Sequence, residues 1–190
     1  ERMNEESANA LLKVMEEPPE GVLFLLTADS LASVLPTIRS RCVSFAVAPV
    51  SLADCTRYCA AQGVDKKTAA LYSELFDGHI GTVLAVARDE ARAAQVEKAL
   101  ELARAAAARD SYTAAVLLAA YEKDKAAASA LLTDFRAVAA AGLRSSPRAP
   151  VQGTQARQAV RLADAALQRL GAQVNPKVVL SVFAAKLRTV

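Results

Sequence analysis

The sequence is poor in the residues from which enzymes most often build a catalytic or metal site. Among its 190 residues there are one histidine, three cysteines and no tryptophan. The histidine, His79, has no evident partner for a catalytic triad or a zinc site, and no glycine-rich phosphate loop occurs. We therefore do not expect catalysis by this chain alone.

Long apolar runs and disulfide patterns are also missing. The longest apolar run, residues 21–28, is far shorter than the roughly 20 residues that span a bilayer, and no charged-then-apolar leader opens the chain. Cys55 and Cys59 lie four residues apart in an expected helix, which is a poor basis for a disulfide framework. These features predict a protein of the reducing cytoplasm without a membrane segment.

Apolar residues are abundant and the charge is nearly balanced. Hydrophobic residues make up 53% of the chain, charged residues make up 23%, and the formal net charge is +3. At roughly 100–200 residues per domain, this composition predicts one or two globular modules with filled cores. Because the positive surplus is small, net charge alone does not indicate a nucleic-acid binder.

The beginning of the chain has the pattern of an α/β domain. An apolar face that starts at Ala10 predicts a helix over 7–17, which the Pro18–Pro19 pair ends. The apolar runs 21–27 and 42–47 are typical of strands buried in a parallel sheet. Because two strands do not make a stable sheet by themselves, we expect residues 1–47 to be the last part of a larger α/β domain.

From Ser51 onward the sequence has helical periodicity and few strand signals. We expect three short helices at 51–62, 66–76 and 81–88, the last of which continues toward Arg109. Four or five longer helices follow in an alanine-rich region. The candidate ranges are 111–121, 124–143, 154–170 and 176–187.

These patterns predict a mainly α protein in three parts. Residues 1–47 are the α/β remnant with about two strands, residues 48–88 form a small three-helix domain, and residues 89–190 form a larger helical domain.

One arginine occupies an unusual position. Arg41 lies between Ser40 and Cys42, where a turn leads into the second expected strand. An arginine is uncommon at the start of a buried strand unless its planar guanidinium has an anionic partner. Arg39 shows that the turn is simply basic, so a surface or salt-bridged Arg41 is the plainer interpretation of these residues alone.

Three other candidate sites are weaker. Glu16 and Glu17 point roughly 100° apart on a helix, so we interpret them as a solvated helix end and not as an acid/base pair. Cys55 and Cys59 share a helical face without a second pair of metal ligands, which favours core cysteines over a zinc or thiol site. His79 follows a turn glycine, and we expect it to be exposed or to cap a helix.

Three motifs resemble the bacterial clamp-loader ATPase family of the AAA+ class. They are Ala-Asn-Ala-Leu-Leu-Lys-Val-Met-Glu-Glu-Pro-Pro at 8–19, Phe-Leu-Leu-Thr at 24–27 and Thr-Ile-Arg-Ser-Arg-Cys at 37–42. The later segments 77–81 and 175–177 fit the lid and collar of that family more loosely. In the family, the P-loop and the Mg²⁺-binding motif precede the helix that opens this chain. The resemblance therefore implies a fragment without the nucleotide-cradling half and without a cofactor of its own.

The resemblance also implies roles for individual residues. Thr27 matches the first sensor position, near the γ-phosphate, and Arg41 in the Ser40–Cys42 motif matches an arginine finger. Such a finger reaches the ATP and Mg²⁺ of a neighbouring subunit, where a fixed cation stabilises charge that develops in phosphoryl transfer.

Gly81 stands where motor subunits of the family carry the arginine of the second sensor. This substitution resembles the delta-prime type of subunit, which donates a finger but does not hydrolyse ATP, whereas a gamma/tau motor subunit is the alternative. The implied partners are the gamma/tau and delta subunits in a five-membered ring held by helical collars, together with the sliding clamp and primed DNA. An unrelated helical interaction module remains a third hypothesis.

Overall fold

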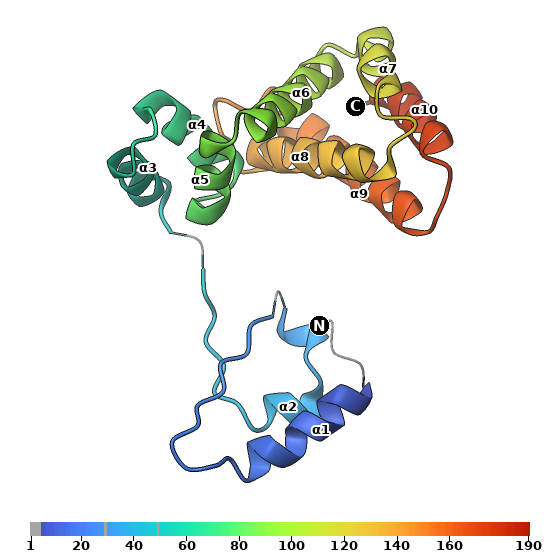
Figure 1. Cartoon of the computed structure of the whole chain (residues 1–190). Helices are drawn as coiled ribbons and strands as arrows, with labels where there is room; N and C mark the ends of the chain where they lie inside the picture. The colour runs from blue at the N-terminus through green and yellow to red at the C-terminus, as the bar shows by residue number, and fades with distance from the viewer. Residues whose placement is uncertain (1–4, 29, 49) are drawn as a thin grey trace. The chain divides into compact units, whose positions relative to one another are not determined.

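The structure, a computed structural model, describes residues 5–28, 30–48 and 50–190 (Figure 1). All regular secondary structure in these ranges is helical, so the predicted mainly α class is confirmed. The chain divides into two compact units, Glu1–Ala48 and Pro49–Val190. The further division of the second unit at residue 88 stays a prediction.

The described residues of the first unit form two helices and one 3₁₀ turn. Helix α1 spans Glu5–Glu16, the 3₁₀ turn η1 spans Leu31–Ser33, and α2 spans Pro36–Arg39. Helix α1 ends just before the Pro18–Pro19 pair, as expected from the steric effect of proline on the preceding residue. The side chain of Ala10, which begins the predicted apolar face, lies outside the described residues.

The two predicted strands are not formed, and this part of the prediction was wrong. Residues 22–28 and 43–48 are extended coil, and Leu25 and Phe45 are 84% and 83% exposed. An extended segment becomes a strand only when a neighbour accepts and donates its backbone hydrogen bonds, and no other described segment does so here. The apolar runs therefore have the composition of strands without the sheet that would bury them.

Residues 50–190, the described part of the second unit, form eight helices. Their bounds lie within two residues of the predicted ones except at one junction. They are α3 (Leu52–Ala61), α4 (Lys66–Leu75), α5 (Ile80–Arg88), α6 (Glu90–Ala107), α7 (Ser111–Ala119), α8 (Lys125–Leu143), α9 (Gly153–Gly171) and α10 (Pro176–Leu187).

The exception is the expected continuation of the helix at 81–88 toward Arg109. Asp89 has extended backbone angles (φ −118°, ψ 110°), which end α5 at this residue. Its carboxylate accepts a hydrogen bond of 3.1 Å from the backbone N–H of Arg92 and thereby starts α6. The acid thus breaks one expected helix into two.

Side-chain caps explain where most of these helices begin. At each of these positions a short polar side chain accepts hydrogen bonds from backbone N–H groups of the first turn that have no partner inside the helix. The capping residues are Ser51, Asp65, Asp89, Asp110, Asp124 and Asn175.

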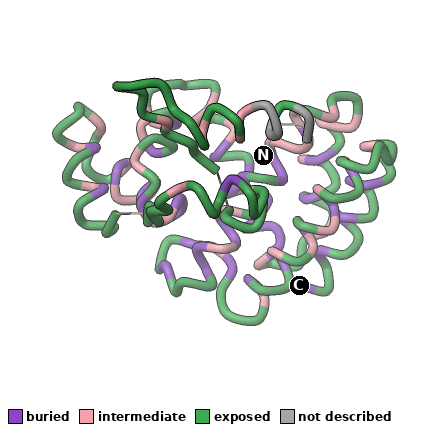
Figure 2. Tube along the Cα trace, turned by 90° about the horizontal axis from the view of Figure 1, so that it is seen from below, coloured by how far each residue is buried: buried purple, intermediate pink, exposed green. Residues whose placement is uncertain are grey.

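Helix α8 is the centre of the core. It packs against α6, α9 and α4 (Figure 1). The rings of Phe135 on α8 and Phe183 on α10 meet edge to face at 5.3 Å. The buried face of α9 is made mostly of small residues, and small residues let the backbones of α8 and α9 approach closely. Those residues are Ala156, Ala159, Ala163 and Ala166, followed by Leu170. Figure 2 shows buried residues along the inner sides of the helices.

Helix α8 is also long and apolar enough to cross a membrane by length and composition, and no other described helix passes this test. Half of its apolar window is buried inside the protein, and it carries Asp134, which is paired with Arg92 of α6. These contacts are those of a central helix in a bundle, so its hydropathy carries no argument for a membrane span.

Candidate functional site

The turn after α2 holds Arg41 in a defined conformation. Ser40 is the C-cap of α2, and its hydroxyl donates to the carbonyl oxygen of Thr37 at 3.0 Å. The side chain of Arg41 folds back over this end of the helix. Its Nη1 donates to the carbonyl oxygen of Thr37 at 3.0 Å and to the Ser40 hydroxyl at 3.3 Å. The guanidinium therefore lies at the negative end of the helix dipole, where a cation is favourable.

Glu16, at the end of α1, is the anionic partner of Arg41. Its Oε1 accepts a hydrogen bond from Nη2 of the guanidinium in an ion pair. The Arg41 side chain is 36% exposed and that of Glu16 is 50% exposed. Ion pairs with this exposure contribute only about 0–1 kcal/mol, so the guanidinium can exchange this partner for a more highly charged anion.

Two further predicted site residues belong to the first unit, Thr27 and Cys42, and only Cys42 adjoins this turn. Thr27 is exposed in extended coil, and no hydrogen bond or ion pair joins it to Arg41 among the described residues. Cys42 is a half-buried free thiol directly after the turn. The structure thus places Ser40, Arg41 and Cys42 together through chain connectivity and does not link Thr27 to them.

Gly81 lies in the first turn of α5, a helix of the second unit. It is exposed, and a Cβ atom built on it would have no other atom within 4 Å. His79 is the exposed N-cap of the same helix and makes no capping hydrogen bond through its side chain. The position of Gly81 would therefore accept a Cβ atom without a clash.

The two cysteines of α3 belong to the core, as predicted. Cys55 and Cys59 are fully buried, and burial is the main cause that raises the pKa of the Cys59 thiol, with Cys55 adding to it. A raised pKa keeps the thiol protonated, which is the opposite of what a nucleophile or a metal ligand needs. No cluster of three or more possible metal ligands occurs among the described residues.

The comparisons with known proteins each cover 30% of the chain or less. Residues 1–51 match the family described as DNA polymerase III, delta subunit. The chain is 62% identical over 42 residues to the DNA polymerase III subunit delta' of Haemophilus influenzae, which is 22% of this chain and 13% of that protein. It is 45% identical over 58 residues to the delta' subunit of Yersinia pestis, which is 30% of this chain and 17% of the relative. Residues 1–51 therefore form a delta-prime-like segment, meaning that they are similar to this type of DNA polymerase III subunit.

Subunits of another type are also similar to part of this chain. The gamma/tau subunit of Mycobacterium tuberculosis is 58% identical over 33 residues, which is 17% of this chain and 6% of that protein. The matched part of the chain therefore spans less than a fifth of the length of each of these relatives. A helical interaction module without any link to replication does not account for these matches.

The delta-prime-like segment contains four of the five predicted site residues. Thr27, Ser40, Arg41 and Cys42 all lie within residues 1–51, whereas Gly81 lies outside the matched family segment. The ion pair that holds Arg41 joins two parts of this segment, the end of α1 and the turn after α2. The site geometry and the similarity thus concern the same residues.

Two polar networks of the second unit were not predicted from the sequence. Arg92 of α6 makes two parallel hydrogen bonds of 2.5 Å to the carboxylate of Asp134 on α8, and Gln95 donates to the same carboxylate at 2.9 Å. The hydrogen bond with Asp134 is the main cause that raises the pKa of Arg92. The two residues are 42 positions apart in the sequence. Helical periodicity predicts charge pairs only between residues three or four positions apart, so it could not indicate this one.

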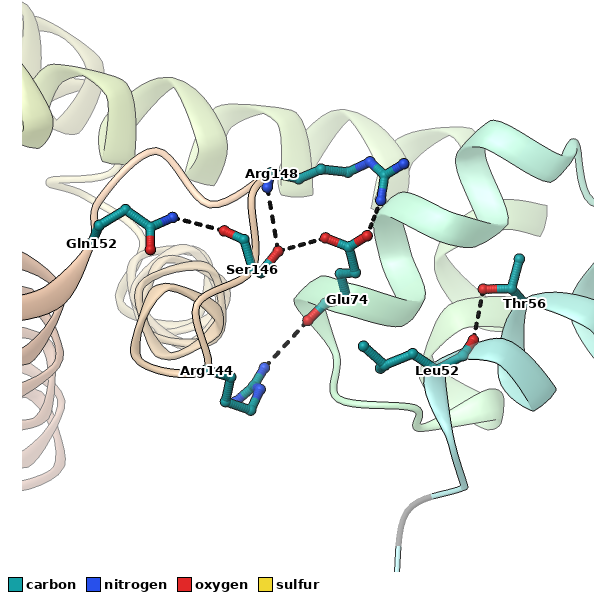
Figure 3. A network of polar contacts seen from close by, with 7 residues as sticks. All are labelled: Leu52, Thr56, Glu74, Arg144, Ser146, Arg148 and Gln152. Atoms are coloured by element: carbon teal, nitrogen blue, oxygen red, sulfur yellow. Dashed lines mark hydrogen bonds and ion pairs between the residues drawn. The ribbon is translucent and has the colours of Figure 1, made fainter.

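The second network connects α4 to the loop after α8 (Figure 3). The Ser146 hydroxyl donates to Oε2 of Glu74 at 2.6 Å, and the Arg148 guanidinium forms an ion pair with Oε1 of the same carboxylate. Arg144 donates to the backbone carbonyl of Glu74 at 3.3 Å and pairs with Asp77 at 3.1 Å. The end of α4 is therefore fastened to the segment between α8 and α9.

Proposed function

We propose that this chain is part of a clamp-loader subunit of the delta-prime type, which supplies Arg41 to the ATP site of a neighbouring subunit. The observation that carries the proposal is the position of Arg41 in a delta-prime-like segment, with its guanidinium oriented by α2 and only weakly paired with Glu16. A γ-phosphate carries more negative charge than one carboxylate, so it would displace Glu16 as the partner of the guanidinium.

The neighbouring residues take supporting roles in this proposal. Ser40 accepts a hydrogen bond from Nη1 of Arg41 and would orient the finger, whereas Cys42 continues the motif and Thr27 takes the sensor-like position. Gly81 supplies no cation to a nucleotide, so the subunit would not hydrolyse ATP. ATP and Mg²⁺ would be held by neighbouring subunits.

The assembly proposed is a cytoplasmic hetero-oligomer. Residues 89–190, which form helices α6 to α10, would serve as the collar that contacts the gamma/tau and delta subunits. The complex as a whole would load the sliding clamp onto primed DNA.

The decisive experiment replaces Arg41 in the intact protein and reassembles it with its partner subunits. We expect Arg41→Ala to lower DNA-stimulated ATPase activity and clamp loading, because an arginine finger accelerates phosphoryl transfer by about 10³-fold or more at the site that it serves. Light scattering of the assembled complex should be unchanged. Arg39→Ala is the matched control, since it removes a cation two residues away on the same turn. Normal ATPase activity of the Arg41→Ala complex would refute the finger role.

A gamma/tau motor subunit is the second candidate function, favoured by the matches to subunits of that type. This alternative requires nucleotide binding by the intact protein. Titration of the intact protein with a fluorescent ATP analogue decides between the two, since a delta-prime-type subunit that supplies only Arg41 should not bind the analogue.

A further inference from the structure

The net charge of +3 hides a strong division of charge along the chain. Residues 125–190 contain ten lysines or arginines and two aspartates, whereas residues 1–124 contain thirteen basic and eighteen acidic residues. The last third of the chain is therefore strongly basic and the part before it is acidic. Charge asymmetry of this kind indicates an anionic partner for the basic part.

The structure strengthens this asymmetry because both aspartates of the basic part are already neutralised. Asp134 is paired with Arg92, and Asp164 is paired with Arg136. Four of the ten basic residues form ion pairs with acids and Lys125 donates to Gln173. The other five are exposed, and the described residues provide no ion-pair partner for them. They are Arg157, Arg161, Arg169, Lys186 and Arg188.

Three of these five basic residues, all arginines, lie on α9 outside its buried face. The helix packs mainly against α8 and α10 through its alanine face (Figure 1). At 100° per residue, Arg157 and Arg161 point away from that face, and Arg169 flanks them two turns later. Gln158 and Gln168 are exposed beside them, and the only acid of the helix is the paired Asp164. The outer face of α9 thus presents guanidinium and amide groups with no unpaired carboxylate.

We propose that the outer face of α9 binds the phosphate backbone of nucleic acid. Arg157, Arg161 and Arg169 would contact phosphates, and the amides of Gln158 and Gln168 would donate additional hydrogen bonds. From Arg157 to Arg169 the helix rises roughly 18 Å at 1.5 Å per residue, the length of about five nucleotide steps of 3.4 Å. The contacts would be independent of base sequence, because the phosphates carry no sequence information.

The composition of this face favours nucleic acid over an acidic protein. Protein interfaces have an apolar centre that is enriched in aromatic residues. None of the large exposed hydrophobic side chains of the described residues belongs to α9. A face of arginine, glutamine and alanine lacks such a centre, whereas these polar groups match phosphate oxygens. The proposal does not depend on the arginine-finger role, since binding by α9 needs neither ATP nor a neighbouring subunit.

The test measures binding of the full chain to a fluorescein-labelled primer–template duplex by fluorescence anisotropy. The affinity is measured in KCl from about 50 to about 200 mM, because each phosphate contact adds about −0.9 to the slope of log K against log salt. The variant Arg157→Gln/Arg161→Gln/Arg169→Gln should reduce the magnitude of this slope by about 2.7 and weaken binding at every salt concentration. Circular dichroism and Tm should stay unchanged, since these arginines make no ion pairs within the described chain.

A second triple variant controls for net charge. Lys66→Gln/Lys67→Gln/Lys123→Gln also removes three positive charges, but from exposed positions outside the basic part of the chain. We expect it to retain the wild-type slope. Equal losses in both triple variants, or no binding by the wild-type chain at low salt, would overturn the proposal. Poly-glutamate that binds as tightly as the duplex and with the same dependence on the three arginines would instead assign the face to an acidic protein.

Discussion

At the scale of single residues, the partner of Arg41 shows what a sequence pattern could not reveal. The motif at 37–42 indicated Arg41 as a candidate site residue, and the helical pattern of residues 7–17 predicted that Glu16 lies at a solvated helix end. The two side chains are 25 residues apart, and they meet because α1 packs against α2. A charge pair of this kind depends on the tertiary arrangement, because helical periodicity relates only residues three or four positions apart.

The buried pair of Arg92 and Asp134 leads to the sharpest prediction at this scale. Arg92→Ala should lower the free energy of unfolding by about 3–5 kcal/mol, because it leaves the Asp134 carboxylate buried without its bidentate partner. The measurement is urea unfolding followed by circular dichroism at 222 nm.

Arg104→Ala serves as the control for that substitution. Arg104 lies on the same helix, and its partner Glu97 is about half exposed, so removal of this pair should change stability by less than about 1 kcal/mol. The double variant Arg92→Met/Asp134→Leu should recover most of the loss, since an apolar pair needs no compensation for burial. A similar effect for Arg92→Ala and Arg104→Ala would contradict this account.

At the scale of helices, replacement of two helical glycines by alanine should change the stability of the protein in opposite directions. A Cβ on Gly142 of α8 would lie 1.9 Å from the backbone carbonyl oxygen of Val151, whereas a Cβ on Gly81 of α5 would meet no atom. Gly142→Ala should destabilise by about 3 kcal/mol, since the loop between α8 and α9 has to move. Gly81→Ala should stabilise by about 0.5–1 kcal/mol, because alanine favours the helix.

Urea unfolding of both glycine variants measures this contrast. If Gly142→Ala were neutral, the close approach of the loop to α8 would not be required for the fold. If Gly81→Ala were destabilising, the space beside the first turn of α5 would be occupied by a group that contacts the glycine.

The helix caps predict a dependence of stability on pH. The hydrogen bonds from the Thr113 hydroxyl and backbone N–H lower the pKa of Asp110 below its ordinary value of 3.8. Because the folded pKa is lower than the unfolded one, the capping contribution is complete above the unfolded pKa and is lost as the pH falls through the folded pKa. The Tm difference between the wild type and Asp110→Ala should therefore be constant near neutral pH and decrease in acid.

The check is thermal unfolding of both proteins at neutral pH and at a pH well below 3.8. Thr113→Val removes the hydroxyl that is the largest cause of the shift, and it should raise the pH at which the capping contribution disappears. A Tm difference that grows as the pH falls would show that the carboxylate does not cap α7 in its ionised form.

At the scale of the whole chain, the two units should differ in their resistance to local unfolding. In the first unit, Ile38 is the only described hydrophobic residue that is buried, whereas the second unit buries residues of all its helices in one core. Amides of α1 and α2 should exchange with solvent much faster than those of α6, α8 and α9, because local opening of α1 and α2 exposes little apolar surface. Hydrogen exchange followed by mass spectrometry measures this directly.

Comparable protection in the two units would contradict this expectation and would indicate that residues 1–48 are stabilised by contacts that the described residues lack. Faster exchange confined to the first unit would agree with its exposed apolar segments. Addition of the partner subunits is then informative, since it should protect the segments that they cover.

Sequence reasoning was most successful where the structure depends on neighbouring residues. The end of α1 before the proline pair, most helix bounds and the helix of residues 176–187 were predicted, because caps and helical hydrogen bonds connect residues at most four positions apart. The candidate site could be predicted in part, since Arg41 and its motif are contiguous in the chain. The break at Asp89 was missed, because an aspartate can lie inside a helix or cap one, and in the structure this residue is the N-cap of α6.

The sequence by itself determined the mainly α class, nearly all helix bounds and the segment that carries the DNA polymerase III similarity. Only the tertiary structure decided which charges are paired, how closely α8 approaches its neighbours, and that the apolar runs after α1 and α2 remain extended coil. The physical reason is the range of the interactions. Helical hydrogen bonds are satisfied within a few residues, whereas a strand, a buried ion pair and a close-packed glycine each require a partner that only the folded chain brings into contact.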